Sequence, residues 1–442
     1  MAKVSQFDFL VMGAGVAGMR AAIELAHHGE VLVVTKESLN ESNTHDPLGG
    51  MAIATEGDAD HLEETSGVDD EAGDGLVYRP AAEALVHEGP MRVAELIEWG
   101  AVFDSEAEEL LRTHEGARLL ARMLYANGAV IGRALAGYAR ASKRIHFAEW
   151  TMVTGLSVAD GRVIGADLAP AGQMADDHTP SRIAARAVLI AAGGAGQVYG
   201  GATNPPVATG DGIALAAAAG AELADMEFYR FYPAEVSLRP VAHFLIGGIK
   251  TDLNGRTGVP GLYAAGEAAC TGVHGGKGLI ANSLLDALVF GTRAGQAMHD
   301  DDLPLAKLDA PEPSFTPLSS DEDAQLEKQI AALQTAMGSY AGRRRENLFL
   351  LEGFAAQAEF ADELKKLVRT GKSSRRLHEA LALNRVAHAI LHAALARTES
   401  RGVHLRKDFP KRDDANFQKH SVYRAGESSP WSPSGKVTFE AW

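Results

Sequence analysis

Three glycines near the N-terminus, Gly13, Gly15 and Gly18, are spaced as G-x-G-x-x-G. They follow an apolar run and precede an alanine-rich stretch, which is the setting of a dinucleotide-binding turn. The first glycine permits the tight turn, the second lets the backbone approach a pyrophosphate, and the third lets the helix pack closely, with its positive end facing the phosphates. The spacing therefore predicts a dinucleotide site, with a plain glycine turn as the alternative.

Three further segments favour FAD over NAD, although both dinucleotides use such a turn. The acidic residue that commonly binds ribose is not cleanly present after the second apolar run, where Lys36 stands. A polar loop with a glycine doublet (42–52) and two glycine-rich strand ends with an acidic residue (189–212 and 257–267) follow along the chain. A flavin dinucleotide is long and needs contacts along its whole length, so these segments indicate FAD.

The elements that must position these residues are predicted by the apolar period. Strands are expected at 7–12, 31–35, 145–168 in the rhythm of a β-meander, 185–196 and 261–266, and helices at about 16–28, 79–99, 116–142 and 209–220. Residues 37–75 are rich in Gly, Asp, Glu and Thr and are expected to form a loop. The fold class is α/β, with a Rossmann-like dinucleotide-binding domain.

The C-terminal third has a different character. Proline, serine and acidic residues mark 302–320 as a linker, so the FAD-binding domain is expected to span 1–301. A helical bundle is predicted over 321–397, where the first apolar stripe runs from Leu326 to Met337 and two further helices fit about 343–369 and 373–397. Residues 398–442 are expected to form an extended tail packed on the body.

Composition limits the possible partners. The formal net charge is −16, which disfavours nucleic acid and anionic lipid surfaces. Cys270 is the single cysteine, so disulfides and multi-cysteine metal sites are excluded and a reducing cytoplasm is expected. No stretch approaches the length of a membrane span, and no metal is expected. A small acidic substrate remains compatible with a local cationic pocket.

The order of motifs resembles that of one flavoprotein superfamily, which contains the L-aspartate oxidases and the flavoprotein subunits of succinate dehydrogenase and fumarate reductase. The matching motifs are GAGVAG (13–18), SNT with GGMA (42–52), NPPVATGDG (204–212), DMEF (225–228), GLYAAGEAACTGVHG (261–275), NSLL (282–285) and ESRG-H with DFP (399–410). Some of these lean toward L-aspartate oxidase, and the KRDD run after the DFP motif leans toward the dehydrogenases.

The resemblance implies a set of FAD contacts at matching positions. They are Gly13, Ala14, Gly15, Val16, Ala17, Gly18, Lys36, Asn43, Thr44, Gly49, Gly50, Val153, Asp211, Glu267, Asn282, Ser283 and Leu284. Covalent members attach the flavin through a histidine, and the aligned residue here is Asn43, so noncovalent FAD is expected. His45 is nearby but out of register, and attachment through it is the alternative.

The substrate positions of the family are largely changed. Its F-Q-F-H-P-T motif reads with Tyr232 in place of the histidine and Ala234 in place of the threonine, and its substrate arginine is replaced by Gly278. Only nine residues separate Pro233 from His243, where the resemblance implies a cap domain with a catalytic arginine, so the cap is expected to be largely absent.

Three residues remain as catalytic candidates: Glu115, His243 and Lys277. Arg230 and Arg239 offer replacement positive charge. Each also has a plain structural interpretation, as a helix-start acid or a solvated cation.

Three functions stay open. The first is FAD-dependent oxidation of L-aspartate to iminoaspartate, as in NAD biosynthesis, with O2 or fumarate as acceptor. The second is a soluble fumarate reductase or succinate dehydrogenase-like flavoprotein. The third is a cap-less flavin-binding electron-transfer protein with little dicarboxylate turnover. The expected partners are a dicarboxylate or amino-acid substrate and an electron-transfer subunit.

Overall fold

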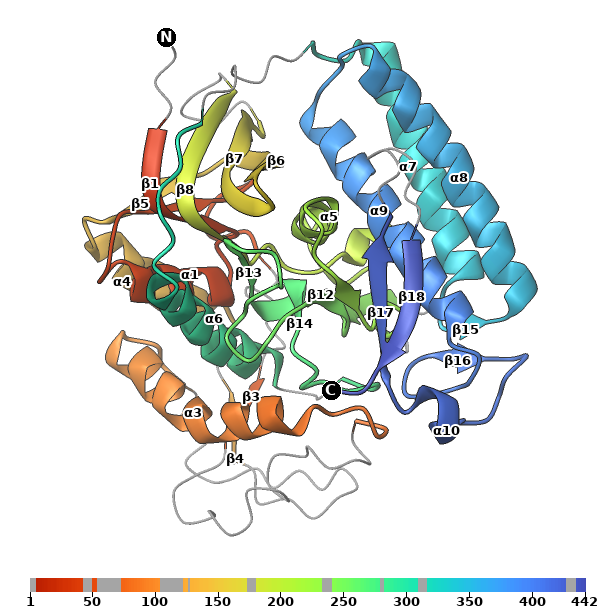
Figure 1. The fold of residues 1–442 in the computed structure, drawn as a ribbon, viewed down its shortest axis with the longest axis horizontal. Coiled ribbons are helices and arrows are strands. Elements are labelled where there is room, and N and C mark those ends of the chain that lie inside the picture. Colours follow the sequence, from red (N-terminus) through yellow and green to blue (C-terminus); the bar gives the residue numbers. More distant parts are fainter. Residues whose placement is uncertain are drawn as a thin grey trace.

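The structure is a computed structural model (Figure 1). It describes residues 5–42, 50–53, 73–103, 122–125, 128–172, 180–232, 241–278, 282–308, 316–426 and 435–442, and for 50–53 and 122–125 it describes the backbone alone.

A seven-stranded sheet forms the centre of the N-terminal part, with strand order β5-β2-β1-β8-β7-β6 and β13 also paired to β8. Its strands are β1 (Ser5–Met12), β2 (Val31–Val34), β5 (Ile145–Ala148), β6 (Thr151–Ala159), β7 (Arg162–Pro170), β8 (Ser181–Ile190) and β13 (Leu262–Ala264). β5, β2, β1, β8 and β13 pair in parallel, whereas β6, β7 and β8 form an antiparallel meander. The predicted α/β class is therefore confirmed.

The strand sequences explain this arrangement. Parallel strands covered on both faces are almost continuously apolar. In β1 both Leu10 and Val11 are fully buried although they point to opposite faces, and Val188 and Leu189 of β8 are buried in the same way. The two faces lie in separate apolar clusters, so helices or strands cover the sheet on both sides.

Helices cover one face of this sheet. They are α1 (Val16–Leu25), α3 (Arg79–Glu98), α4 (Gly128–Ala141) and α6 (Ser283–Asp300). Figure 1 shows α6 running beside α1, with α3 outside it. Gly291 and Gly295 of α6 face the backbone of α1, where a Cβ at Gly291 would lie 2.7 Å from Ala17 O. This close contact holds α6 against the length of α1 from Ala17 to Glu24.

Smaller elements lie between the sheet and the C-terminal part. Helix α5 (Asp211–Ala218) lies beyond the other face of the sheet (Figure 1). A five-stranded sheet has the order β14-β12-β9-β17-β18, from β9 (Leu223–Ala224), β12 (Gly248–Lys250), β14 (Ala269–Cys270), β17 (His420–Ala425) and β18 (Gly435–Glu440). The remaining strand pairs are β10 (Tyr229–Tyr232) with β11 (Val241–Leu245), β3 (Gly50–Ile53) with β4 (Arg122–Tyr125), and β15 (Arg344–Arg345) with β16 (Leu405–Arg406). Short helical turns are η4 (Gly196–Val198), η5 (Gly266–Ala268) and α10 (Asp414–Phe417).

Three long helices form the C-terminal bundle: α7 (Ser320–Tyr340), α8 (Asn347–Arg369) and α9 (Arg375–Ala396). Helix α7 begins with a capping box, in which the Ser319 hydroxyl accepts from Glu322 N and the Glu322 carboxylate accepts from Ser319 N. The predicted apolar stripe from Leu326 to Met337 is buried. Because the bundle and the parallel sheet share one apolar cluster, α9 reaches the interior of the molecule.

Two expectations about local structure were wrong. Residues 122–125 were predicted as part of a long helix but form β4, and the helix itself is α4, which begins at Gly128. Residues 50–53 were predicted as loop but form β3, which pairs with β4. Pairing between segments so far apart in the chain is a long-range interaction, and the local apolar period does not contain it.

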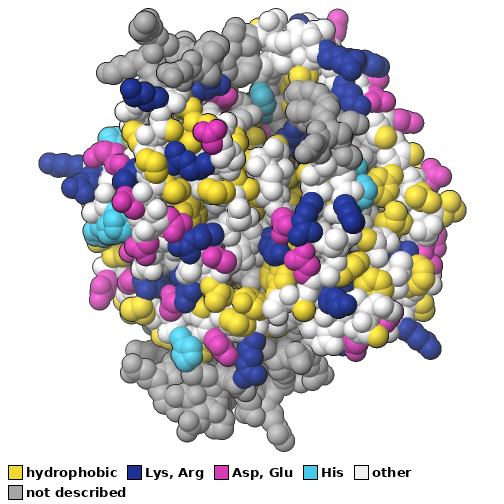
Figure 2. Space-filling view, in the orientation of Figure 1, with side chains coloured by type: hydrophobic (Ala, Val, Ile, Leu, Met, Phe, Trp, Pro, Cys, Tyr) yellow, Lys and Arg dark blue, Asp and Glu magenta, His cyan; other side chains and the backbone are white. Residues whose placement is uncertain are grey.

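Charges of both signs are interspersed on the face shown in Figure 2, where they do not gather into a patch of one sign. Within the described residues, no helix has the length and hydropathy needed to cross a membrane.

Candidate flavin and substrate site

The turn between β1 and α1 has the geometry of a phosphate-binding loop. Gly13 has φ +110°, and a Cβ there would overlap Ala191 O at the end of β8. A Cβ at Gly18 would overlap Gly13 O, so the first turn of α1 lies directly against this loop. Gly15 is the N-cap of α1 and makes no side-chain cap hydrogen bond. The N-terminal end of α1 therefore lies at the carboxyl ends of the strands without a capping side chain, which is a setting that suits an anionic ligand.

Glu267 of η5 forms a second wall beside this turn. Its Oε1 accepts from Leu245 N at 3.2 Å, and a Cβ at Gly194 would overlap its carboxylate. A Cβ at Gly266 would lie 2.9 Å from the Cβ of Ala17, which places η5 against the first turn of α1. The structure thus brings the Gly13–Gly18 turn together with the predicted segment 257–267, which is about 250 residues further along the chain.

The N-terminal end of α6 forms the third wall. Asn282 is its buried N-cap, while Ser283 is exposed and Leu284 is half-buried. Asp286, one turn into the helix, is buried, and its Oδ1 accepts from Thr271 Oγ1 at 3.4 Å. Burial raises the pKa of Asp286 to about 7, and the Thr271 hydrogen bond only partly opposes this.

Two further residues that were predicted to contact the flavin, Lys36 and Val153, lie on or just after strands of the seven-stranded sheet. Lys36, just after β2, contacts Asp211 of α5, with Nζ 2.6 Å from Oδ2. Val153 is a buried residue of β6, paired with Leu168. Asn43, Thr44 and Gly49 lie outside the described residues, and so does the catalytic candidate Glu115.

A cluster of aromatic and cationic side chains lies on the β10–β11 hairpin. The His243 Nδ1 is 2.7 Å from Thr203 Oγ1, and its ring centroid is 4.2 Å from that of Tyr232. The Arg230 guanidinium lies over the same Tyr232 ring, with its central carbon 5.9 Å from the ring centroid. Arg230 is half-buried and makes no ion pair with the described carboxylates.

His274 lies beside this hairpin. Its ring packs edge-on against Phe244, the residue paired with Arg230 across the hairpin, with 5.2 Å between ring centroids. His274 is buried, and neither ring nitrogen has a hydrogen-bond partner among the described residues. Burial and the charge of Arg230 lower the pKa of His274 to about 4, so the imidazole is neutral at pH 7. A buried polar group without a partner is costly, which indicates a position where a ligand or water completes the hydrogen bonding.

Lys277 and Gly278 end the same loop. Gly278 has φ +79°, and a Cβ there would lie 3.2 Å from the Ile246 side chain. A larger residue at this position would be strained, so the backbone conformation of the loop favours glycine there. Lys277 is exposed and has a partner within the molecule.

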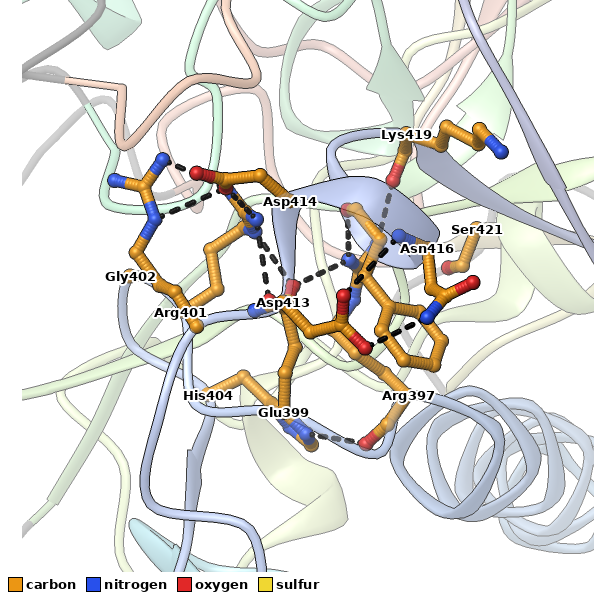
Figure 3. Close-up of polar contacts among 12 residues, drawn as sticks. Arg397, Glu399, Arg401, Gly402, His404, Asp413, Asp414, Asn416, Lys419 and Ser421 are labelled. Carbon is orange, nitrogen blue, oxygen red and sulfur yellow. Dashed lines mark hydrogen bonds and ion pairs between the residues drawn. The ribbon is translucent and has the colours of Figure 1, made fainter.

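The C-terminal segment around residues 397–404 packs against the loop that contains Gly276, Lys277 and Gly278. Val403 N donates to Gly276 O at 2.9 Å. Figure 3 shows the adjoining polar network, in which Glu399 lies between Arg397 and Arg401 at 3.1 and 2.5 Å. All three charged side chains are fully buried, so this part of the tail is a rigid support for the loop.

Comparisons with known proteins agree with this geometry. The family model described as an FAD binding domain matches residues 8–237 and 234–284, and the model described as the fumarate reductase flavoprotein C-terminus matches residues 330–440. This chain belongs to the succinate dehydrogenase and fumarate reductase flavoprotein superfamily. It is therefore an FAD-dependent oxidoreductase, and the tight turn at Gly13 fits that cofactor because its backbone, without side chains, can approach the pyrophosphate.

The relatives include both activities that the motifs suggested. An L-aspartate oxidase of Streptomyces coelicolor is 32% identical, over 94% of this chain and 91% of that protein. A fumarate reductase flavoprotein subunit of Mycobacterium tuberculosis is 28% identical, over 99% of this chain and 98% of that protein.

Solved structures show the same fold. The quinol fumarate reductase of E. coli has a TM-score of 0.83 at 22% identity, over 100% of this chain and 97% of that chain. Sdh1 of Mycobacterium smegmatis has a TM-score of 0.82 at 24% identity, over 100% of this chain and 95% of that chain.

Several residues at the site were missed in the sequence. His274 could have been noticed within the GLYAAGEAACTGVHG motif, and Asp286 could have been noticed in the turn after NSLL. Glu379, which contacts Lys36, gave no such signal because it lies 343 residues further along the chain in an ordinary helical pattern.

Proposed function

We propose that this chain is an oxidoreductase of the L-aspartate oxidase type, which removes two electrons from a small anionic amino acid or dicarboxylate. The observation that carries the proposal is the proximity of Arg230 and His274. The Arg230 guanidinium makes no ion pair with the described carboxylates, and the buried, neutral His274 ring has no hydrogen-bond partner among the described residues. Guanidinium binds carboxylate through parallel hydrogen bonds, and a neutral imidazole can donate one hydrogen bond and accept another.

The residues of the three walls would hold the cofactor. The backbone of the turn at Gly13 would hold the pyrophosphate, Glu267 would accept from the ribityl hydroxyls, and Asn282 at the N-terminal end of α6 would complete the site. When bound, FAD supplies a two-electron acceptor for a hydride from a substrate carbon. We further propose that FAD is held noncovalently, because Asn43 occupies the aligned attachment position.

The chain's own residues would bind and orient the substrate. Arg230 and Lys277 would hold carboxylates, and His243, whose Nδ1 faces Thr203, would present its Nε2 to the substrate. For L-aspartate, the Cα–H leaves as hydride and the amine gives up a proton, so that iminoaspartate forms. O2 or fumarate would then take the two electrons.

A cap-less electron-transfer flavoprotein is the second candidate. The family model matches in two segments that meet at 234–237, and both alignments, over 536 and 583 positions, are longer than this chain. The relatives thus contain residues that the chain lacks, and the connection from β10 to β11 is too short for a folded domain. These observations support an open site that exchanges electrons with a partner subunit.

Ligand binding to the purified yellow protein tests the proposal. Aspartate or succinate should shift the flavin absorption spectrum, and Arg230→Gln, which installs the residue of the family motif, should raise Kd about tenfold or more. Arg133→Gln, on the exposed side of α4, is the matched control and should leave Kd unchanged. Anaerobic addition of aspartate should then bleach the flavin. If neither aspartate nor succinate changes the flavin spectrum, and only dithionite bleaches it, the electron-transfer function is favoured.

Retention of colour tests the mode of attachment. Acid precipitation should release the flavin to the supernatant. Colour that stays with the pellet, and is lost in His45→Ala, would show covalent attachment instead.

A further inference from the structure

The Lys36 ammonium is surrounded by three acceptors. Its Nζ lies 2.7 Å from Thr209 Oγ1, 2.6 Å from Asp211 Oδ2 and 3.0 Å from Glu379 Oε1. An ammonium group has three donors, so each donor is used. The Lys36 side chain is 11% exposed, and those of Asp211 and Glu379 are 7% and 4% exposed.

The acceptors are themselves fixed. Thr209 Oγ1 donates to Asp211 Oδ1 at 2.9 Å, so these two acceptors of the Lys36 ammonium are also bonded to each other. Glu379 also binds Arg375 and Arg376, at 3.0 and 3.1 Å. Burial alone would raise the pKa of Glu379, but Lys36 and Arg375 outweigh it and hold the pKa below its usual value, so this carboxylate stays charged.

The network joins three distant elements. Lys36 follows β2, Asp211 begins α5, and Glu379 lies in the first turns of α9. Arg375 makes a second connection, from α9 back to Glu37 at 2.6 Å. The end of the second strand is where a dinucleotide-binding fold places the adenosine ribose. The helical bundle therefore reaches the adenosine end of the flavin site through Glu379.

We infer that Lys36 and Glu379 form a latch that positions the adenosine end of the FAD site, and that Lys36 does not bind the flavin through its ammonium. Lys36 is thus a positioning residue, and Glu379 brings the C-terminal bundle into the cofactor site. This inference depends on FAD binding and is independent of the substrate.

The rate of FAD release, followed by the recovery of flavin fluorescence after dilution, tests the latch. Lys36→Met and Glu379→Gln should each speed release about tenfold or more, because each removes one charge from the buried network and leaves the opposite charges there less well compensated. The double variant should release FAD no faster than the faster single variant, since both remove one interaction. The melting temperature of the flavin-free protein should show the same non-additivity.

Salt dependence separates the latch from a direct contact. If Lys36 touched a phosphate, Lys36→Met would flatten the dependence of FAD affinity on ionic strength, while Glu379→Gln would leave FAD release unchanged. That pair of results would overturn the inference. The latch requires the same salt dependence in both variants as in the unaltered protein.

Two further variants keep the test decisive. Glu327→Gln removes the neighbouring ion pair to Arg376, at 2.5 Å, without touching Lys36, and should release FAD at the original rate. If Glu379→Gln does not fold, Glu379→Asp keeps the charge but shortens the reach to Lys36. It should still release FAD faster, and unchanged release would also overturn the inference.

Discussion

At the scale of single residues, the turn of the proposed flavin site requires glycine, because a side chain there would overlap the neighbouring backbone. Gly13 combines a positive φ with a backbone contact to Ala191 so close that no Cβ fits. Both properties follow from the passage of β1 into α1 beside the end of β8. The glycine turn is therefore a steric requirement of the strand order as well as of the cofactor.

Replacement of Gly13 by alanine should reduce the amount of bound FAD strongly, because the loop must move away from Ala191. The ratio of flavin to protein absorbance after purification measures this. Gly137 of α4 is the matched control, since a Cβ there meets nothing within 4 Å. Gly137→Ala should keep full flavin and raise stability by about 0.5–1 kcal/mol. Equal flavin content in both variants would contradict the assignment of the turn.

Asp286 gives a prediction about pH. Its folded-state pKa of about 7 lies above the unfolded value of 3.8, so the folded state holds a proton that the unfolded state has lost between these values. Stability from this group therefore falls as pH rises from about 4 to 7. Asp286→Asn removes the titration. As pH rises over this range, the melting temperature of the variant should therefore increase relative to that of the unaltered protein. A difference that stays constant with pH would show that the carboxyl is not buried as described.

These residues also show what the sequence can predict. The turn at Gly13 and the stripe from Leu326 to Met337 are local patterns, and both were predicted. The contact of Lys36 with Glu379 joins residues 343 positions apart, and nothing local marks it. The strand at 122–125 was missed for the same reason, because its partner β3 is distant in the chain.

At the scale of elements, the bundle has a polar interior between α8 and α9. His388 Nδ1 lies 3.1 Å from Gln357 Oε1, and Gln357 Nε2 donates to Asn384 Oδ1 at 2.8 Å. The His388 Nε2 has no partner among the described residues, and the His392 ring lies 4.3 Å away. Burial, with a smaller effect of His392, lowers the pKa of His388 to about 3. The bundle thus requires a neutral imidazole at this position.

Acid should therefore weaken the bundle. The pKa of His388 is 6.5 in the unfolded chain and about 3 in the folded chain, so between these values the unfolded chain binds a proton that the folded chain does not bind. The free energy of unfolding therefore decreases as pH falls through this window. At pH 5 the loss amounts to about 2 kcal/mol. His388→Phe should remove this part of the pH dependence in thermal unfolding, whereas His146→Gln on the exposed edge strand β5 should not. Parallel pH profiles for the unaltered protein and His388→Phe would refute the account.

At the scale of the whole molecule, the cofactor site and the substrate site differ in how completely they are built. The walls that we propose for FAD come from the turn between β1 and α1, from η5 and from the N-terminal end of α6, and close contacts join them. The proposed substrate side depends on one hairpin and one loop, and Gly278 of that loop has no side chain. A chain of this construction keeps its cofactor more securely than its substrate.

L-Aspartate oxidase activity should accordingly be far below that usual for the family. Arginine side chains orient a C4 diacid against the flavin, and Gly278 supplies no side chain for this purpose. The eight residues from 233 to 240 cannot fold into a domain that would carry a second arginine and exclude water. Each lost charge contact at a transition state costs about 3 kcal/mol, which is roughly a hundredfold in rate.

Steady-state assays with aspartate, succinate and fumarate measure this directly, and weak turnover is expected. Robust turnover would mean that another cation replaces the missing arginines. Lys277, next to Gly278 in the same loop, is the first candidate, and Lys277→Ala should then abolish the activity while leaving the flavin content unchanged. If Lys277→Ala also stays active, the substrate is held by residues other than those of this loop, and the charge of Arg230 on the hairpin becomes the main determinant of binding.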